Sequence, residues 1–400
     1  MFKQKFKKAI SEYLGLENIF LFWKGRIALY AILKALDIEE GDEIILPAFT
    51  CVVVVNPIIY LGAKPIYIDI DPRTLNIDPN KIEKKITKRT KVIIAQNTFG
   101  LSSDLDAIFE IAKKNNLCVI EDCAHGFGGT YKGKKNGTIA DASFFSTQWN
   151  KPFTTGIGGI AVTRKESLAN KLKYIEERAI EPTYKEKIML KGLLEIRKKF
   201  LKYNIYWFAL NTYRKLSKWN IVLGSSQGYE IERPVKPENF LKGLSEVQAE
   251  EGLKYFEKFN DKYKIDSIIE HRKKIAYLYK KILTELDLDP PYESPYAEHA
   301  YLRFPFFVKD RKKFFTLAEK ENIEIGDWFI SPIHPVVKNF DLWYYKVGDN
   351  PISELGSNHI VNFPTHENID ENYVNRLYEF LKKNKDLLLG SNLYNILQDN

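Results

Sequence analysis

The sequence predicts an α/β protein in which helices cover both faces of a mostly parallel central sheet, followed by a small C-terminal α+β domain. Three observations lead to this prediction. Between residues 41 and 163, short runs rich in β-branched residues alternate with helical stretches. These runs are apolar throughout, which is typical of parallel strands buried on both faces. Beyond residue 164 the chain becomes basic and helical, and a Pro/Tyr-rich stretch then precedes a shorter mixed segment.

Six runs are predicted to form the sheet, with helices between them. The strands are Glu43–Phe49, Lys64–Asp71, Lys91–Gln96, Leu117–Asp122, Ala142–Gln148 and Gly159–Thr163, and two of the helices are Val52–Leu61 and Asp104–Asn115. In the second helix, Leu105, Ile108 and Ala112 share one face. Because ligands of such sheets bind at the carboxyl ends of the strands, we expect the chemistry there.

Residues 1–286 are predicted to form a large domain that carries a basic, aromatic helical insertion at about 164–234. Its most periodic late segment, Lys242–Phe259, is predicted to be a helix. A linker is expected at Asp287–Tyr296. Residues 287–400 are predicted to form the small domain from the apolar run Ala300–Val308 and helices at Arg311–Asn322 and Asp370–Lys385.

Composition excludes several classes of protein. The 400 residues carry 60 Lys and Arg against 52 Asp and Glu, a net charge of +8, which is too small an excess to indicate nucleic-acid binding. The chain has three cysteines, which are too few for a disulfide framework. These cysteines and the six histidines are not spaced as metal ligands are, so no metal site is predicted. The charged N-terminus lacks a signal-peptide pattern, and the apolar runs are too short to span a bilayer. We therefore expect a cytoplasmic protein.

The strongest signal for chemistry lies between residues 119 and 159. Asp122 ends a predicted strand, Lys151 follows it, and a glycine-rich turn comes next at Thr154–Gly159. Pyridoxal phosphate (PLP) needs a lysine to hold its aldehyde as a Schiff base and to move a proton. It also needs a carboxylate that keeps its ring nitrogen protonated, and donors for its phosphate. The segment therefore suits a PLP site.

Several ordered motifs give the chain a specific resemblance. They are GRIAL (Gly25–Leu29), PAFTC (Pro47–Cys51), EDCAH (Glu121–His125), FSTQWNKPFTTGIGG (Phe145–Gly159) and SEVQAEEGL (Ser245–Leu253). In this order they resemble the DegT/DnrJ/EryC1/StrS sugar aminotransferases, PLP-dependent enzymes of fold type I, the aspartate aminotransferase class. The resemblance spans about Ile19–Leu387, interrupted by the insertion. It implies a homodimer with a shared active site, an amino-acid donor such as glutamate, and a nucleotide-linked keto-sugar acceptor in amino-sugar and cell-surface glycan biosynthesis.

The resemblance also implies roles for three residues around the cofactor ring. Lys151 would be the Schiff-base lysine and proton shuttle, and Asp122 would pair with the pyridine nitrogen. His125 would stand near the phenolic oxygen of the ring. Each residue also has an alternative without a role at the cofactor. Lys151 could be an ordinary surface lysine, Asp122 could cap the following turn, and His125 could be a hydrogen-bonded structural histidine.

Three further residues are implied at the cofactor phosphate. Ser146 would bind it together with the backbone N–H groups of Gly25 and Arg26. Arg26 replaces the family's threonine, and its guanidinium could add a direct contact. The alternative is that Ser146 only hydrogen-bonds backbone groups at the end of its strand. Arg26 would then be a solvated cation at the start of a helix.

Besides the replacement of threonine by Arg26, the sequence departs from the family pattern at Cys51, Leu241–Gly243 and Ile325–Phe329. Cys51 replaces the aromatic residue that stacks on the cofactor ring. Leu241–Gly243 replaces the motif whose asparagine reaches the partner subunit's phosphate, so Asn239 or a residue of the insertion could take that role. The segment Ile325–Phe329 lacks the family's histidine, which predicts a different sugar contact. His334 matches a family histidine on the substrate side.

The insertion accounts for the basic charge of the chain. Residues 164–220 carry 15 Lys and Arg against 6 Glu, a net charge of +9. One helical stripe is formed by Met189, Leu193, Ile196, Phe200, Tyr203, Trp207 and Leu210. This pattern fits a helical hairpin packed on its own dimer, a peripheral contact of segment 189–219 with an anionic membrane, or cations that meet a substrate diphosphate.

Two other functions remain open from the residues. A few family members are PLP-dependent sugar dehydratases, but these replace the lysine with histidine, so Lys151 argues against that activity. A non-catalytic regulatory or binding paralogue is the second alternative, because Cys51 and Leu241 depart from the family pattern.

Overall fold

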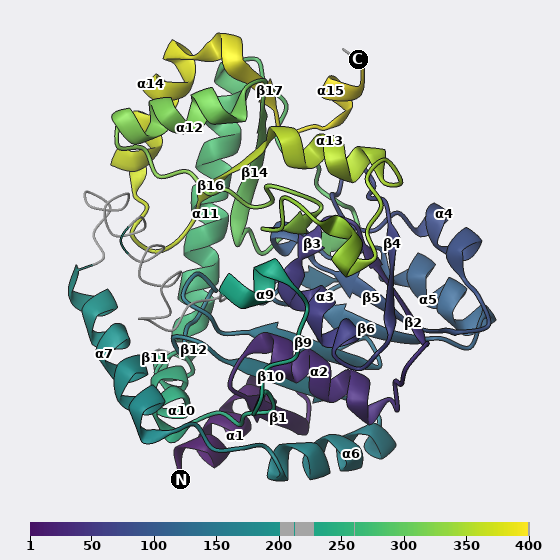
Figure 1. The fold of residues 1–400 in the computed structure, drawn as a ribbon. Coiled ribbons are helices and arrows are strands. Elements are labelled where there is room, and N and C mark those ends of the chain that lie inside the picture. Colours follow the sequence, from purple (N-terminus) through teal and green to yellow (C-terminus); the bar gives the residue numbers. More distant parts are fainter. Residues whose placement is uncertain (201–211, 213–227, 260, 399–400) are drawn as a thin grey trace.

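A seven-stranded sheet forms the centre of the structure, a computed structural model that describes residues 1–200, 212, 228–259 and 261–398 (Figure 1). Its spatial order is β1-β10-β9-β6-β5-β2-β4. The strands are β1 (Asn18–Phe22), β2 (Glu43–Pro47), β4 (Lys64–Ile68), β5 (Thr90–Gln96), β6 (Cys118–Asp122), β9 (Ala142–Ser146) and β10 (Gly159–Thr163). Strand β10 pairs antiparallel with β1 and β9, and the other four pairs are parallel. The predicted mostly parallel α/β sheet is confirmed.

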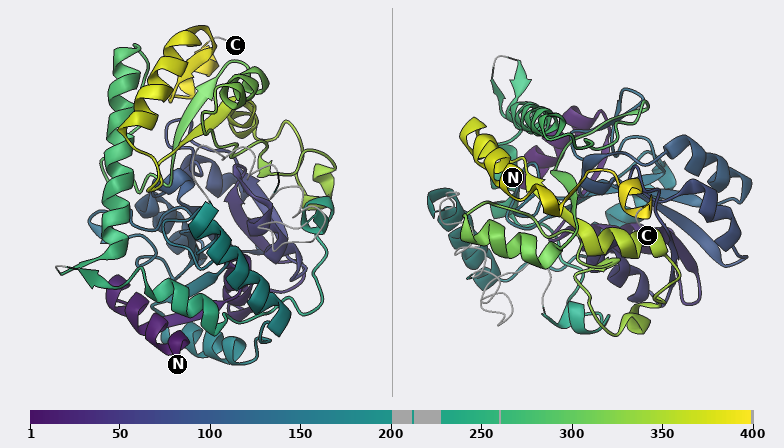
Figure 2. Two further views of the ribbon diagram at one scale, coloured as in Figure 1. Left: turned by 90° about the vertical axis from the view of Figure 1, so that its left-hand side faces the viewer. Right: turned by 90° about the horizontal axis from the view of Figure 1, so that it is seen from above.

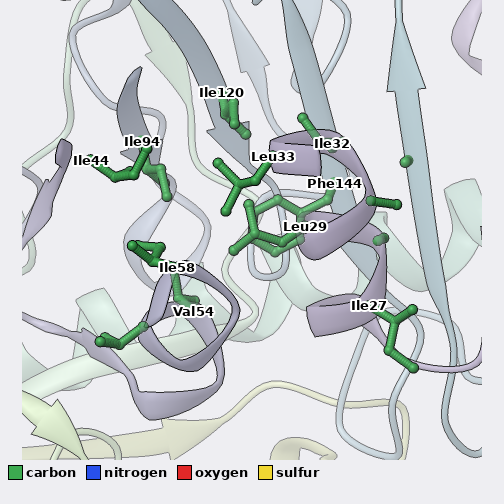
Figure 3. Close-up of a cluster of buried hydrophobic side chains, with 14 of the residues drawn as sticks. Ile27, Leu29, Ile32, Leu33, Ile44, Val54, Ile58, Ile94, Ile120 and Phe144 are labelled. Atoms are coloured by element: carbon green, nitrogen blue, oxygen red, sulfur yellow. The ribbon is translucent and has the colours of Figure 1, made fainter. Parts of the chain in front are cut away.

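Helices cover both faces of this sheet, because successive strand residues point to opposite sides. On strand β2, Ile44 and Leu46 belong to one buried cluster and Ile45 to another. The first cluster is packed by α2 (Gly25–Ala35), α3 (Val52–Ile59) and α6 (Glu166–Glu177), as Figure 3 shows for α2 and α3. The opposite face is packed by α1 (Phe2–Leu14), α4 (Pro79–Ile82), α5 (Leu105–Lys114) and α10 (Glu246–Leu253).

A second hydrophobic core lies in the C-terminal part. Its sheet has the order β16-β14-β17, and both pairs are antiparallel. The elements are β14 (Arg303–Val308), α12 (Arg311–Lys320), α13 (Pro351–His359), β16 (Ile360–Pro364), α14 (Glu371–Lys383), β17 (Leu388–Gly390) and α15 (Tyr394–Gln398).

The long helix α11 (Lys264–Glu285) connects the two cores. Ile265, Ile268 and Ile269 near its start are buried with the large sheet, whereas Tyr279 and Leu283 are buried in the second core. Figure 2 shows this helix running alongside both parts of the protein. Two short pairings add to the connection, namely β3 (Thr50–Cys51) with β15 (Ile333–His334) and β7 (Thr130–Tyr131) with β13 (Ala297–Glu298).

The prediction of one helix over Lys242–Phe259 is wrong at both ends. Helix α10 starts only after Ser245, whose hydroxyl accepts a hydrogen bond from the Gln248 N–H at 3.3 Å. The Gln248 side chain accepts one from the Ser245 N–H at 2.8 Å, which completes a capping box. Gly243 is unavailable to the helix, because it pairs with Phe22 at the edge of the sheet.

The predicted apolar stripe of the insertion is not the packed face of α7 (Tyr184–Phe200) in its described part. Leu190 and Leu194 are buried in the first core. Ile196, which belongs to the predicted stripe, is 57% exposed. The stripe positions from Phe200 onward lie outside the side chains that the structure describes.

Candidate active site

A cavity of about 560 Å³ opens at the carboxyl ends of the central strands. The last residues of β5, β6 and β9 (Gln96, Asp122 and Ser146) line it, as expected for a parallel sheet. The second core supplies the opposite wall through Arg303 and the segment around Trp328. All seven residues predicted from sequence to form the site line this one cavity, namely Gly25, Arg26, Cys51, Asp122, His125, Ser146 and Lys151.

Lys151 lies in the loop between β9 and β10 and is 8% exposed. Hydrogen bonds within the loop fix its course, among them Lys151 N–H to the Gln148 carbonyl at 2.9 Å. Burial lowers the pKa of the Lys151 amine to about 8, although Asp122 opposes this shift. The amine is therefore neutral more often than an exposed lysine, and a neutral amine is the nucleophilic form.

Asp122 ends β6 with its carboxyl group buried. Burial raises the pKa of Asp122 to about 6, while a hydrogen bond from the Ala124 N–H (2.9 Å) and the charge of Lys151 act in the opposite direction. The group is thus still ionised at neutral pH. A buried carboxylate of this kind suits a protonated ring nitrogen as its partner.

His125 is held in a defined orientation behind Asp122. Its Nδ1 accepts a hydrogen bond from the Phe99 N–H at 3.3 Å, and its ring stacks on Trp328 with centroids 4.8 Å apart. Burial, followed by the charge of Lys151, holds the pKa of His125 well below its usual value. The ring is therefore neutral, and with Nδ1 accepting, the proton is on Nε2.

The start of α2 forms a cationic end of the cavity. Arg26 is buried there and forms an ion pair with Glu230 of the short helix α9 (Gly228–Glu232). Arg26 is therefore not a solvated cation, and its predicted contact with phosphate stays a prediction. Burial, followed by the charge of Arg26, lowers the pKa of the neighbouring Lys24 to about 8. Both cations and Ser146 lie beside the N-terminal backbone of α2, where anions bind favourably.

Cys51 and His334 lie opposite each other in the parallel pair β3–β15, and both line the cavity. Burial raises the pKa of the Cys51 thiol. His334 Nδ1 accepts a hydrogen bond from the Ile330 N–H at 3.3 Å. Asn239, the predicted substitute for the cross-subunit contact, is exposed and is not part of the cavity wall.

The comparison with protein families decides which group of proteins this is. The model of the DegT/DnrJ/EryC1/StrS aminotransferase family matches residues 1–196 and 243–382. The chain belongs to this family. The predicted family and its aminotransferase class are thus confirmed at the level of family membership. The unmatched stretch, residues 197–242, is shorter than the insertion that the sequence predicts at 164–234.

Individual members of the DegT/DnrJ/EryC1/StrS family resemble the chain to different extents. GDP-perosamine synthase of Caulobacter vibrioides is 40% identical over 178 residues, which are 44% of this chain and 48% of the synthase. The chain therefore spans about half the length of that curated relative. The spore coat polysaccharide biosynthesis protein SpsC of Bacillus subtilis is 28% identical over 97% of this chain and 90% of its own.

Solved structures of the family share the fold. An aminotransferase from Psychrobacter cryohalolentis superposes with a TM-score of 0.73 at 21% identity, over 96% of this chain and 91% of its own. NtdA of Bacillus subtilis, whose structure holds the cofactor PMP, gives a TM-score of 0.70 at 24% identity. This superposition covers 96% of this chain and 77% of NtdA. The predicted fold is therefore the fold of this aminotransferase family.

Charged and aromatic residues at or beside the cavity were missed from sequence, and four of them matter most for its charge and shape. They are Lys24, Glu230, Arg303 and Trp328. Lys24 directly precedes the predicted motif Gly25–Leu29, so position alone could have found it. Arg303 and Trp328 come from the C-terminal part, whose approach to the large sheet depends on tertiary packing.

Two further features were searched for among the residues that the structure describes. No group of three or more His, Cys, Asp or Glu side chains there could hold a metal ion. None of the described helices has the length and apolar character that a membrane span requires.

The glycine-rich turn of the family motif is required by close packing. A Cβ on Gly159 would collide with the carbonyl of Lys24 and lie 2.6 Å from the Gly25 nitrogen. We expect Gly159→Ala to lower the free energy of unfolding by about 1–3 kcal/mol, because the start of α2 must move. Gly192→Ala in α7 is the matched control, since no atom lies within 4 Å of its Cβ. It should stabilise the protein by about 0.5–1 kcal/mol. Equal urea-unfolding curves for the two variants would contradict this account.

The lowered pKa of Lys151 predicts a pH dependence for the reaction with the PLP aldehyde. Because burial lowers this pKa from 10.5 to about 8, the neutral fraction of the amine should rise about tenfold per pH unit below 8 and level off above it. Stopped-flow absorbance between pH 6 and 9.5 measures the rate. N-acetyl-lysine methylamide is the control. Its amine is exposed to water and has an ordinary lysine pKa, so its rate should still be rising at pH 9.5. A protein rate that continues to rise beyond pH 9 would show that the pKa of Lys151 is not lowered.

Proposed function

We propose that this chain is a PLP-dependent aminotransferase that transfers an amino group from an amino acid, by family analogy glutamate, to a nucleotide-linked keto sugar. The observation that carries this proposal is the single cavity in which a buried lysine, a buried carboxylate and a cationic helix start come together. Family membership and sugar-related relatives support the substrate class.

The residues present fit PLP at each of its polar groups. The Asp122 carboxylate would keep the pyridine nitrogen protonated, and the His125 Nε2–H would donate to the phenolic oxygen. Ser146, the backbone N–H groups of Gly25 and Arg26, and the nearby cations would hold the phosphate. Bound PLP would supply an electron-accepting ring for the carbanion formed at the substrate.

Lys151 would perform the proton transfer that both half-reactions need. Its amine, with a pKa of about 8, can release and accept a proton near neutral pH. It would move the proton between the substrate carbon and the C4′ atom of the cofactor. The indole of Trp328 lies beside this amine, with its centre 4.8 Å from the Lys151 Nζ.

Absorbance spectroscopy tests this function directly. Protein loaded with PLP should be yellow and should lose that colour when glutamate is added. A nucleotide-linked keto sugar should then restore the colour. Protein that binds no PLP, or that keeps its colour with every amino donor, would contradict an aminotransferase and favour the non-catalytic alternative. Release of water from the sugar without consumption of a donor would instead favour a dehydratase, which Lys151 argues against.

The proposal includes a homodimer with a shared active site, because the family analogy places a phosphate contact on the partner subunit. Size-exclusion chromatography with light scattering tests whether the protein is a dimer.

The contact of segment 189–219 with an anionic membrane remains a prediction, as does a cytoplasmic location. Residues 201–211 and 213–219 of that segment lie outside the described residues, and Leu190 and Leu194 pack into the protein. Deletion of 189–219 should abolish any binding to anionic vesicles.

A further inference from the structure

Helix α7 brings Arg197 to the back of the loop that carries Lys151. The Arg197 guanidinium donates a hydrogen bond from Nη1 to the backbone carbonyl of Trp149, and its Cζ lies 5.9 Å from the centre of the Trp149 ring. Trp149 stands in a turn that is closed by a hydrogen bond from the Lys151 N–H to the Gln148 carbonyl at 2.9 Å. Arg197 itself does not line the cavity. It therefore reaches Lys151 only through the backbone of this turn.

The body of α7 packs on the same loop. Leu190 is fully buried, and a Cβ added to Gly156 would lie 2.6 Å from the Leu190 Cδ1 and 2.9 Å from the Trp149 Cη2. These three residues are thus in close contact at the glycine-rich turn. Near the start of the helix, the Glu186 carboxylate forms an ion pair with the Lys242 amine at 2.6 Å. These contacts fix the position of α7, and with it the guanidinium that holds the loop.

The guanidinium of Arg197 is largely withdrawn from water. Burial lowers the pKa of Arg197, and groups on other elements oppose this shift, namely Tyr255, Glu367 and Glu251. Arg272 of α11 is a neighbouring cation, whose pKa is lowered by burial first and then by Arg303 and Arg197. A buried guanidinium needs acceptors within the protein, and the Trp149 carbonyl is one of them. Removing Arg197 would cost this carbonyl its charged donor.

We propose that Arg197 is a positioning residue, which keeps Lys151 aimed into the cavity by anchoring the turn that carries it. This inference rests on the proposed function of Lys151. Arg197 is the first residue beyond the stretch 1–196 that matches the family model, so the anchor comes from a part of this chain that the family pattern does not include. Anchoring matters because misplacing a reacting group by about 1 Å can lower a rate about 10²-fold.

The first test measures the Lys151 amine without any cofactor. Trace labelling with acetic anhydride between pH 6 and 11, followed by mass spectrometry, gives the pH at which this amine becomes neutral, about 8 in wild type. Arg197→Met keeps the aliphatic stem and removes the donor. The turn should loosen and expose the amine to water, so the midpoint should rise by about one pH unit or more, and labelling at pH 7 should fall about tenfold. The variant leaves unchanged the groups that face the amine, namely Asp122, Cys51, Arg303 and Arg272. An unchanged midpoint would overturn the proposal.

Three further variants separate positioning from a general effect on the fold. Arg197→Lys retains a charged donor and should bring the midpoint back close to the wild-type value. Lys191→Ala removes an exposed lysine of the same helix and should leave the midpoint at about 8. Leu172→Ala in α6 opens a cavity in the first core, so it should unfold at a lower urea concentration without moving the midpoint. Equal shifts in Leu172→Ala and Arg197→Met would overturn the proposal. If Arg197→Met does not fold, Arg197→Gln replaces it, and failure of both to fold would show a structural role instead.

The second test follows the loss of colour when glutamate is added to PLP-loaded protein. Arg197→Met should lower the rate at saturating glutamate about 10- to 100-fold. The glutamate concentration for half-maximal rate should stay within about twofold of wild type, because Arg197 lies outside the cavity. A higher concentration with an unchanged maximal rate would contradict positioning and indicate a role in binding. A wild type that never loses its colour contradicts the proposed function, whereas the labelling midpoint still decides the role of Arg197.

Discussion

Replacing Lys151 with alanine should reduce amino-group transfer by at least about 10²-fold, because proton transfer by a positioned side chain alone contributes roughly 10²–10⁴-fold. Lys151 is the buried amine of the cavity wall, and its loop is fixed by backbone hydrogen bonds, so the change should leave the fold intact. Single-turnover absorbance with glutamate measures the loss.

An exposed lysine supplies the control for this variant. Lys134→Ala, on the short strand β8 (Lys134–Lys135), removes a charge outside the cavity and should keep the wild-type rate. A small amine such as methylamine should restore part of the rate of Lys151→Ala, since it can enter the space left by the side chain and carry the proton. If Lys151→Ala without added amine reacts as fast as wild type, the proton is moved by another group.

Glu230→Gln is expected to have the largest effect on stability. It removes the carboxylate that faces the buried guanidinium of Arg26, and breaking a buried ion pair in this way costs about 3–5 kcal/mol. Burial acts to lower the Arg26 pKa, and Glu230 outweighs it and raises that pKa. Urea unfolding at pH 7 should therefore show a clearly lower free energy of unfolding for the variant.

Inorganic phosphate offers a second readout for Glu230→Gln. An anion that binds near Lys24 and Arg26 should stabilise the variant more than wild type, because in wild type Glu230 already balances the charge. Glu238→Gln is the control, since Glu238 is exposed and does not line the cavity. Equal stability of the two variants, with equal phosphate effects, would show that the Arg26–Glu230 pair contributes little.

The sequence predicted best what local pattern determines. Apolar runs located the strands, and the strand ends placed Asp122 and Ser146 at the edge where ligands bind. The start of α10 was misplaced because periodicity continues through Ser245, whereas the capping hydrogen bonds decide the boundary. Strand β1 was missed because Asn18–Phe22 is a short apolar run at the edge of the sheet, which it joins through β10.

The missed residues of the site share a different cause. The partner of Arg26, Glu230, is 204 residues away in the sequence, so no spacing rule connects them. Arg303 was part of a predicted strand, and the strand pattern does not indicate which wall of which cavity it reaches. Trp328 stood in a segment that departs from the family pattern, and its stacking on His125 arises only when the two cores pack together.

Helix α11 has a consequence for how the two walls of the cavity are placed relative to each other. Its first turns pack beside Phe153, two residues after Lys151, and further along Arg272 holds the backbone next to Arg303. One uninterrupted helix of 22 residues, about 33 Å long, therefore packs against both walls of the cavity. A single residue inserted between Ile269 and Arg272 would shift one end by about 1.5 Å and turn it by about 100°. The relative placement of the two cavity walls thus depends on an unbroken helical register between Ile269 and Arg272.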